Sequence, residues 1–243
     1  MAINVNTVYQ TVLMILNKEQ RGYMTPTEFN KVATQVQLEI FEKYFEDLNQ
    51  QLRIPQVDTD YADRQENIDE KIAIFKTFGP AVYNNTTLPN NPFFTLPTTD
   101  AYGNSVTFYR LGNVLYGRDR FVQRLDRHDF YYVDRSKLTR PTKINPIYLY
   151  ENHKLFIKPD SITSDIQIDY VRKPSDVNWG FNVGSLGQYE FSSDNSTDFE
   201  LHISEQAEVI LKILLYAGII IKDPQIVQAA AAQVQAEEIN KKS

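Results

Sequence analysis

One uninterrupted helix is the feature that most constrains this chain. It starts at Thr25-Pro26-Thr27-Glu28, where a threonine cap, a proline at the first helical position and a glutamate at the third form a capping box. Neither glycine nor proline follows before Pro55. This stretch predicts a helix of about 27 residues, or roughly 40 Å.

Two apolar stripes run along this predicted helix. A helix with two such stripes must be covered from two sides, so we expect cover from other helices of the chain or of a neighbouring copy. The first stripe comprises Phe29, Val32, Val36, Ile40, Tyr44 and Leu48, and the second comprises Phe41, Phe45 and Leu52.

Helical patterns also occupy both ends of the sequence. Asn6 is expected to cap a first helix of about 13 residues that ends near Gly22. Ser204 is expected to cap a helix through Ile221 that is apolar nearly all round, and Asp223-Pro224 starts another. The alanine-rich last helix is narrow and can pack closely against a partner. Our candidate contact residues on it are Val227, Ala230, Ala231 and Val234.

Between the helices the pattern changes to short strands. Residues 147–159 predict a hairpin with a turn at Asn152-His153, and residues 165–174 predict a further strand. A short helix is expected from Asp126 to about Leu138. Residues 56–71 are expected to be an exposed acidic connector, and residues 180–199 a loop. Earlier strand candidates are 72–78, 105–111, 113–116 and 120–125.

These patterns together predict an α+β fold. Residues 1–70 and 200–243 are expected to form a helical bundle from the two ends of the chain. Residues 71–199 are expected to form an inserted β-rich region, built around a small antiparallel β unit.

Charge and composition exclude several classes of protein. The net charge is −6, so tight binding of nucleic acid is not expected, although an acidic protein can surround DNA without holding it. Cysteine is absent, which excludes disulfides, thiolate zinc sites and cysteine nucleophiles. The start of the chain lacks a signal-peptide pattern, and the longest apolar run, residues 209–221, is short for a bilayer span. We therefore expect a soluble protein made in the cytoplasm.

No group of residues has the spacing of an active site. His128, His153 and His202 lack the i,i+4 spacing of a metal pair, and Asp126-Arg127-His128-Asp129 is better explained by a helix cap with an exposed histidine. Glycine-rich phosphate loops and a G-x-S-x-G elbow are missing. Paired carboxylates of a glycosidase could hide among the 31 acids. We expect no enzyme, no catalytic residues, no cofactor and no metal.

The basic residues concentrate in one segment, 118–143, where four aspartates and two tyrosines, Tyr131 and Tyr132, lie among them. A nucleic-acid patch is one interpretation. A salt-bridged surface or a docking face for an acidic partner is the interpretation that we favour. The basic residues are Arg118, Arg120, Arg124, Arg127, Arg135, Lys137, Arg140 and Lys143.

Four stretches of the sequence carry a family resemblance. They are VYQTVLMILNKEQRGYMTPTEFNKVATQVQLEIFEKYFEDLNQQLR near the start, YRLGNVLYG at 109–117, LTRPTKINPIYLYENHKLFIKP at 138–159 and VRKPSDVNWGF at 171–181. These stretches resemble virion proteins of crAss-like short-tailed bacteriophages. The resemblance implies a head-to-tail connector (ring, or adaptor) protein in the neck of the virion. Such proteins form a homo-oligomeric ring below the portal protein, commonly of twelve copies, and dock the next ring or tail protein. Genomic DNA passes through the channel without specific binding.

The resemblance also implies an adaptor-like plan, with a helical bundle, a β insertion and a C-terminal helix that often reaches the neighbouring ring. It supplies no catalytic residues. Three alternatives remain open. The protein could be another ring or tail component of the virion, a phage-encoded cell-wall hydrolase using scattered carboxylates, or a ligand-binding module.

Overall fold

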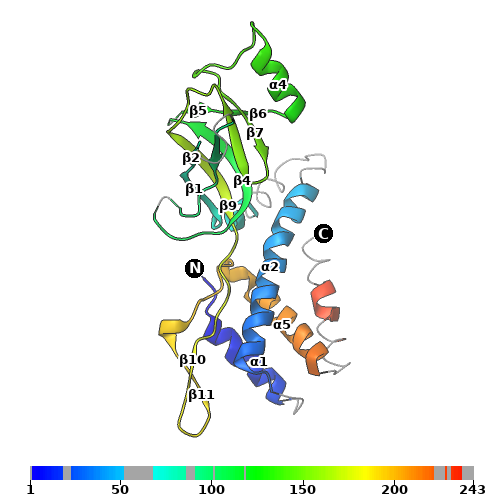
Figure 1. Ribbon diagram of the computed structural model, residues 1–243. Coiled ribbons are helices and arrows are strands. Elements are labelled where there is room, and N and C mark those ends of the chain that lie inside the picture. The colour runs from blue at the N-terminus through cyan, green and yellow to red at the C-terminus, as the bar shows by residue number, and fades with distance from the viewer. Residues whose placement is uncertain are drawn as a thin grey trace. The chain divides into compact units, whose positions relative to one another are not determined.

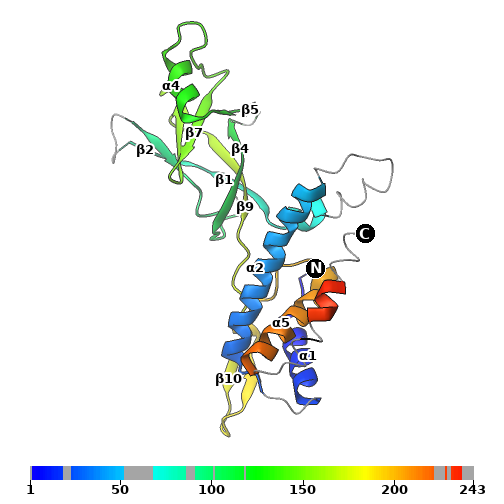
Figure 2. The ribbon, with the colours of Figure 1, turned by 90° about the vertical axis from the view of Figure 1, so that its right-hand side faces the viewer.

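Helices from both ends of the chain belong to one unit of the computed structural model (Figures 1 and 2). The longest among the described residues are α1 (Val5–Lys18), α2 (Pro26–Gln51) and α5 (Gln206–Ile221). The structure describes residues 2–18, 23–51, 68–85, 91–100, 102–117, 119–221, 228 and 231–236. The chain is α+β and divides into two compact units. One is a helical unit of Met1–Ile74 with Pro174–Ser243, and the other is a β unit of Phe75–Lys173. No helix of the described residues is long and apolar enough to cross a membrane.

The capping box at the start of α2 is confirmed. The Thr25 backbone N–H donates to the Glu28 carboxylate at 2.9 Å, and the Glu28 N–H donates to the Thr25 hydroxyl at 3.3 Å. Both stripes of α2 face apolar neighbours, since Phe29 and Phe41 are fully buried. Leu52 lies outside the described residues. The other buried members of the stripes are Val36, Ile40 and Tyr44.

The caps predicted for the two shorter helices are wrong. Helix α1 begins at Val5, and the Asn4 side chain accepts from the Thr7 N–H at 3.0 Å. Asn6 instead lies inside the first turn. Before α5 the chain makes a 3-10 turn, η2 (Ile203–Glu205), where the His202 ring accepts from the Ser204 N–H. In both places a second polar side chain near the predicted cap competes successfully for the free N–H groups. The predicted stop at Gly22 lies outside the described residues.

Residues 180–199, predicted to be a loop, contain a β-hairpin. Strand β10 (Phe181–Val183) pairs antiparallel with β11 (Tyr189–Phe191) in a two-stranded sheet (Figure 1). A 3-10 turn, η1 (Ser193–Asn195), follows. The many Gly, Ser and Asn residues that suggested a loop occupy the hairpin's turn and its flanks, and they hid the short alternation of apolar side chains on its strands.

The segment after Lys173 belongs to the helical unit, whereas the sequence division placed everything up to residue 199 in the insertion. A polar stripe on α2 holds this segment. The Thr34 hydroxyl accepts from the Val177 N–H at 3.1 Å, and the Asn30 side chain accepts from the Trp179 N–H at 2.7 Å. The buried Gln37 side chain donates to the Ser175 carbonyl and accepts from the Glu200 N–H.

The β unit contains two sheets. One has the order β1 (Lys76–Pro80), β9 (Ile166–Arg172), β4 (Phe108–Tyr116), β5 (Arg120–Phe121). The other has the order β2 (Val82–Asn84), β3 (Phe93–Thr95), β8 (Lys154–Lys158), β7 (Ile147–Glu151), β6 (Gln123–Arg124). All pairings are antiparallel except β6 with β7. Side chains from both sheets share one core, which includes Phe94, Leu155, Val114 and Ile168.

The predicted hairpin is confirmed. Strands β7 and β8 pair antiparallel, from Ile147 opposite Lys158 to Glu151 opposite Lys154. Asn152 and His153 both take a left-handed backbone, with φ of 50° and 55°. Two such residues give the type I′ twist that joins adjacent strands tightly.

The other strand predictions are partly right. Residues 68–73, which the sequence divided between the exposed connector and the first strand, are helical, and residues 52–67 lie outside the description. The candidates 105–111 and 113–116 are one bulged strand, β4. Gly112 permits its close approach to β9, because a Cβ there would lie 2.8 Å from the Asp169 carbonyl oxygen. The candidate 120–125 is divided into β5 and β6.

Candidate functional site

Helix α4 (Arg127–Arg135) presents the candidate site and is anchored by one face. Phe130 is 2% exposed and packs on Ile147 and Leu149 of β7. The side chain between them, Tyr148, points to the core between the sheets. Successive side chains of β7 thus point to opposite faces of the sheet: one face packs in the core and the other packs against α4. The helix starts and ends within the predicted range, with Asp126 at the N-cap position but without a side-chain cap bond.

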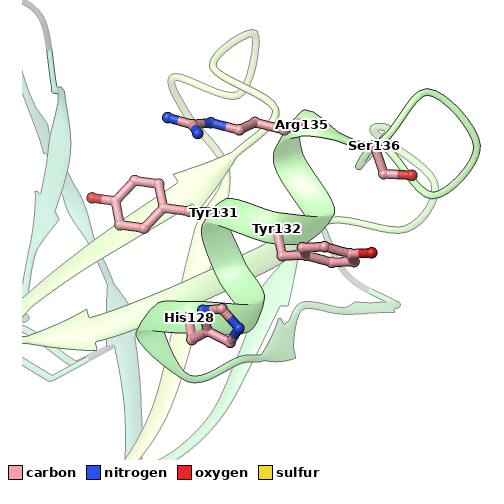
Figure 3. Close-up of a pocket in the computed structure, with 5 residues that line it drawn as sticks. All are labelled: His128, Tyr131, Tyr132, Arg135 and Ser136. Atoms are coloured by element: carbon pink, nitrogen blue, oxygen red, sulfur yellow. The ribbon is translucent and has the colours of Figure 1, made fainter.

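The opposite face of α4 borders an open hollow of about 450 Å³ (Figure 3). Tyr131 and Arg135 are one helical turn apart and extend to the same side of the helix. Tyr132 lies near His128, with ring centroids 6.4 Å apart. The lining residues are His128, Tyr131, Tyr132, Arg135 and Ser136. Aromatic rings and a guanidinium next to each other suit a partner that offers carboxylates and apolar area.

The basic segment is only partly neutralised. Lys158 forms a 3.7 Å ion pair with Asp134, and Arg127 lies 3.8 Å from Glu151. In contrast, Arg135, Lys137 and Arg140 are exposed and have no ion pair within the described residues. The salt-bridged interpretation therefore accounts for part of this segment. Arg118 lies outside the description.

Large apolar side chains lie exposed beside these cations. Tyr132 is 72% exposed and Leu138, in the loop that follows α4, is 94% exposed. Single exposed apolar residues are ordinary, but several of them interleaved with arginine are typical of a protein contact. We call this set the α4 surface, and it comprises Tyr131, Tyr132, Arg135, Lys137, Leu138 and Arg140.

The three histidines lie on three different elements. His128 lies on α4, His153 lies in the β7–β8 turn within 3.3 Å of the Tyr150 hydroxyl, and His202 precedes α5 within 2.9 Å of the Ser204 hydroxyl. No cluster of three His, Asp or Glu side chains suited to a metal ion occurs among the residues that the structure describes. Asp126, His128 and Asp129 are all exposed at the start of α4.

The buried acids of the helical unit have lysine partners. Glu208 accepts from Lys43 at 3.2 Å, and Lys212 lies 3.7 Å from the same carboxylate. Glu205 is paired with Lys71. These carboxylates hold helices together and face lysines instead of an open cleft. Sequence reasoning, which read α5 as nearly all apolar, missed this network.

Two of the four contact residues predicted on the last helix lie outside the residues that the structure describes. Val227 and Ala230 are among the residues not described, whereas Ala231 and Val234 lie in the helical stretch 231–236 and are half-buried. The choice of these four residues remains a prediction.

Sequence reasoning missed a second exposed apolar feature, the β10–β11 hairpin. Leu186 is 92% exposed and Val183 is 63% exposed. The ring of Phe181 stacks on Trp179, with centroids 6.0 Å apart, and fixes the base of the hairpin to the helical unit. The signal that could have revealed it is the alternation Phe181-x-Val183 and Tyr189-x-Phe191 on either side of a glycine-rich turn.

Comparison with protein-family models gives no match, and comparison with curated proteins gives none either. What the site can do therefore follows from its residues. The α4 surface combines exposed aromatic rings, a rigid anchor on a sheet and cations that form no ion pair with any residue that the structure describes. Such an arrangement is suited to binding a partner.

Proposed function

We propose that this chain is a structural virion protein of a crAss-like short-tailed phage. Copies of it form a ring, twelve-fold in the proposal, in the head-to-tail connector below the portal. The ring extends the DNA channel and docks the next ring or tail protein. The chain has no catalytic role in this proposal, and genomic DNA passes through without specific binding.

The observation that carries this proposal is the order of the elements. Both ends of the chain build a helical unit, and Phe75–Lys173 forms a β unit inserted into it. That order agrees with the adaptor-like plan implied by the resemblance of residues 8–53, 109–117, 138–159 and 171–181 to connector proteins.

Two exposed features support an assembly role. The α4 surface and the β10–β11 hairpin each present large apolar side chains to solvent, with Leu138 and Leu186 more than nine-tenths exposed. Apolar groups collected at projecting elements are typical of contacts that are completed by a partner. An assembly protein needs at least two such contacts, one on each side.

Native mass spectrometry of the full chain, with and without the portal protein of the same phage, tests the proposal. We expect a closed ring of about twelve copies that binds the portal. A chain that remains monomeric under both conditions contradicts it. Cryo-microscopy of purified virions then gives the position of the ring. Density for this protein in the lower tail would mean that it is another ring or tail component and not the ring below the portal.

A cell-wall digestion assay separates the proposal from the hydrolase alternative. We expect no release of soluble fragments from host cell-wall material by the purified chain. Release that is abolished by a single Asp or Glu substitution would replace the structural role with an enzymatic one.

A further inference from the structure

The two units carry opposite charges. The helical unit has 11 Lys and Arg against 22 Asp and Glu, a net charge of −11. The β unit has 14 against 9, a net charge of +5. The whole-chain charge of −6 hides this division. Each copy therefore offers a cationic surface and an anionic surface that can complement those of another copy.

Helix α2 supplies a defined anionic counterpart. Glu42 and Glu46 are one turn apart, both are exposed, and neither has an ion pair or hydrogen bond within the described part of the chain. Like charges at this spacing repel each other, which opposes helix formation. Half-buried Leu38 and Phe45 adjoin them on the helix. We call Glu42 and Glu46 the α2 carboxylate pair.

We propose that the α4 surface binds the α2 carboxylate pair of a second copy of this chain. Arg135 and Arg140 pair with the carboxylates, because a guanidinium matches a carboxylate with two parallel N–H donors. Tyr132 and Leu138 cover the apolar side chains beside them. The inference rests on the proposed ring, since a ring is closed by a heterologous contact in which each copy supplies two different surfaces.

A nucleic acid is the other anionic partner that these cations fit. The carboxylate partner agrees better with the surface, because exposed Leu138 offers nothing that a phosphate backbone would bind. The −11 charge of the helical unit also attracts the α4 surface and repels DNA.

A charge exchange between the two surfaces tests the inference on the full chain by sedimentation velocity. R135E/R140E and E42K/E46K should each weaken self-association by at least about tenfold, because two ion pairs become repulsive contacts. An equal mixture of the two variants should recover wild-type association, since each restores the complement of the other. K31E, which changes an exposed lysine elsewhere on α2, should associate as the wild type does. Raising the salt to about 0.5 M should weaken the wild-type contact, because exposed charges are screened.

Several results would overturn the inference. They are wild-type association in both reversal variants, a mixture that fails to recover, or a wild-type chain that stays monomeric at high micromolar concentration. Loss of duplex-DNA binding in R135E/R140E with unchanged self-association would assign the surface to nucleic acid instead.

The same experiments separate this inference from the proposed function. Unchanged association in both variants removes the contact and leaves the connector role intact. Absence of the protein from purified virions removes the connector role, while recovery in the mixture would still establish the contact.

Discussion

The helical unit and the β unit differ in how they satisfy their buried backbone polar groups. Each must bury backbone polar groups around an apolar core. In the β unit, strand pairing satisfies them, and no residue of its described part that carries a charge or an amide side chain is buried. In the helical unit, the helices satisfy their own backbone groups, whereas side chains of α2 bind the backbone of the segment after Lys173. Gln37, Glu205 and Glu208 are buried in this unit.

The difference shows which contacts specify each unit. Strand register specifies the β unit, because a slip of one residue would turn every apolar side chain to the wrong face. Polar side chains specify the helical unit, because Asn30, Thr34 and Gln37 fix the segment after Lys173 against α2. The single tryptophan, Trp179, lies on this segment, so its fluorescence reports on the helical unit alone.

Leu155→Ala should have the largest effect, and in the β unit. Leu155 is fully buried between the sheets, so the cavity costs about 3–4 kcal/mol of unfolding free energy. Hydrogen exchange of β7 to β9 measures it. Leu138→Ala, at a 94% exposed position, should change stability by less than about 0.5 kcal/mol. If the Leu155 variant lost as much stability by Trp179 fluorescence as by hydrogen exchange of the β unit, the two units would unfold together. The contrast between the units would then not hold.

Gln37→Ala should have the next largest effect, and in the helical unit. The substitution leaves the Ser175 carbonyl and the Glu200 N–H without their buried partner, at a cost of about 2–3 kcal/mol. Urea unfolding followed by Trp179 fluorescence measures it. Gln35→Ala is the matched control, because Gln35 is exposed on the same helix and, within the described residues, its side chain bonds only to Glu39. If both variants lose the same stability, the polar stripe does not specify this unit.

Sequence patterns predicted what depends on local chemistry. The Thr25 to Glu28 capping box, the Asn152-His153 turn and the start of α4 each need only a few adjacent residues. The α+β class followed from the change in period along the chain. The charges of the α4 surface were visible in the sequence. That the nearby acids Asp134 and Glu151 pair with Lys158 and Arg127, and leave Arg135 without an ion pair among the described residues, depended on the fold.

The failures share a different cause. The polar stripe on α2 pairs with residues more than 130 positions away, as Gln37 does with Ser175. Lys212 is four residues from Glu208, but Lys43 and Lys71, the other lysine partners of the buried glutamates, are more than 130 positions away from them. No spacing rule identifies such pairs from one sequence, so α5 was expected to be apolar nearly all round and residues 174–199 were assigned to the insertion.

Thr25→Ala tests how much a local signal contributes where long-range contacts already hold the helix. Loss of the cap should cost about 1 kcal/mol. The Thr25 hydroxyl and, to a smaller extent, the Thr25 backbone N–H donate to the Glu28 carboxylate and lower its pKa. The contribution of the cap should therefore be present above the ordinary pKa of glutamate and lost as pH falls. Urea unfolding at neutral and acidic pH measures both effects. Thr27→Ala, an exposed change in the first turn, is the control. A loss as large as that of Gln37→Ala would contradict this ranking.

The smallest expected effect occurs at alkaline pH and concerns tyrosine hydroxyls. The two units differ in what raises the pKa of these hydroxyls. In the helical unit, a hydrogen bond to the Glu39 carboxylate raises the pKa of Tyr216 to about 12. In the β unit, burial raises the pKa of Tyr148 and Arg124 opposes the rise. The folded protein therefore keeps the Tyr216 proton where the unfolded chain, with an ordinary pKa near 10, loses it.

The sign of the pH dependence follows from this order of protonation. The contribution of Tyr216 is complete below about pH 10 and is lost as pH rises towards 12. Solvent screening at this partly exposed site keeps it below about 1 kcal/mol. Burial also raises the pKa of Tyr9 and Tyr44, so the informative quantity is the difference between the wild type and Tyr216→Phe across this range. That difference should shrink from pH 9 to pH 12 when unfolding is followed by Trp179 fluorescence. A constant difference would show that Tyr216 stabilises the helical unit through packing, as the apolar side chains stabilise the β unit.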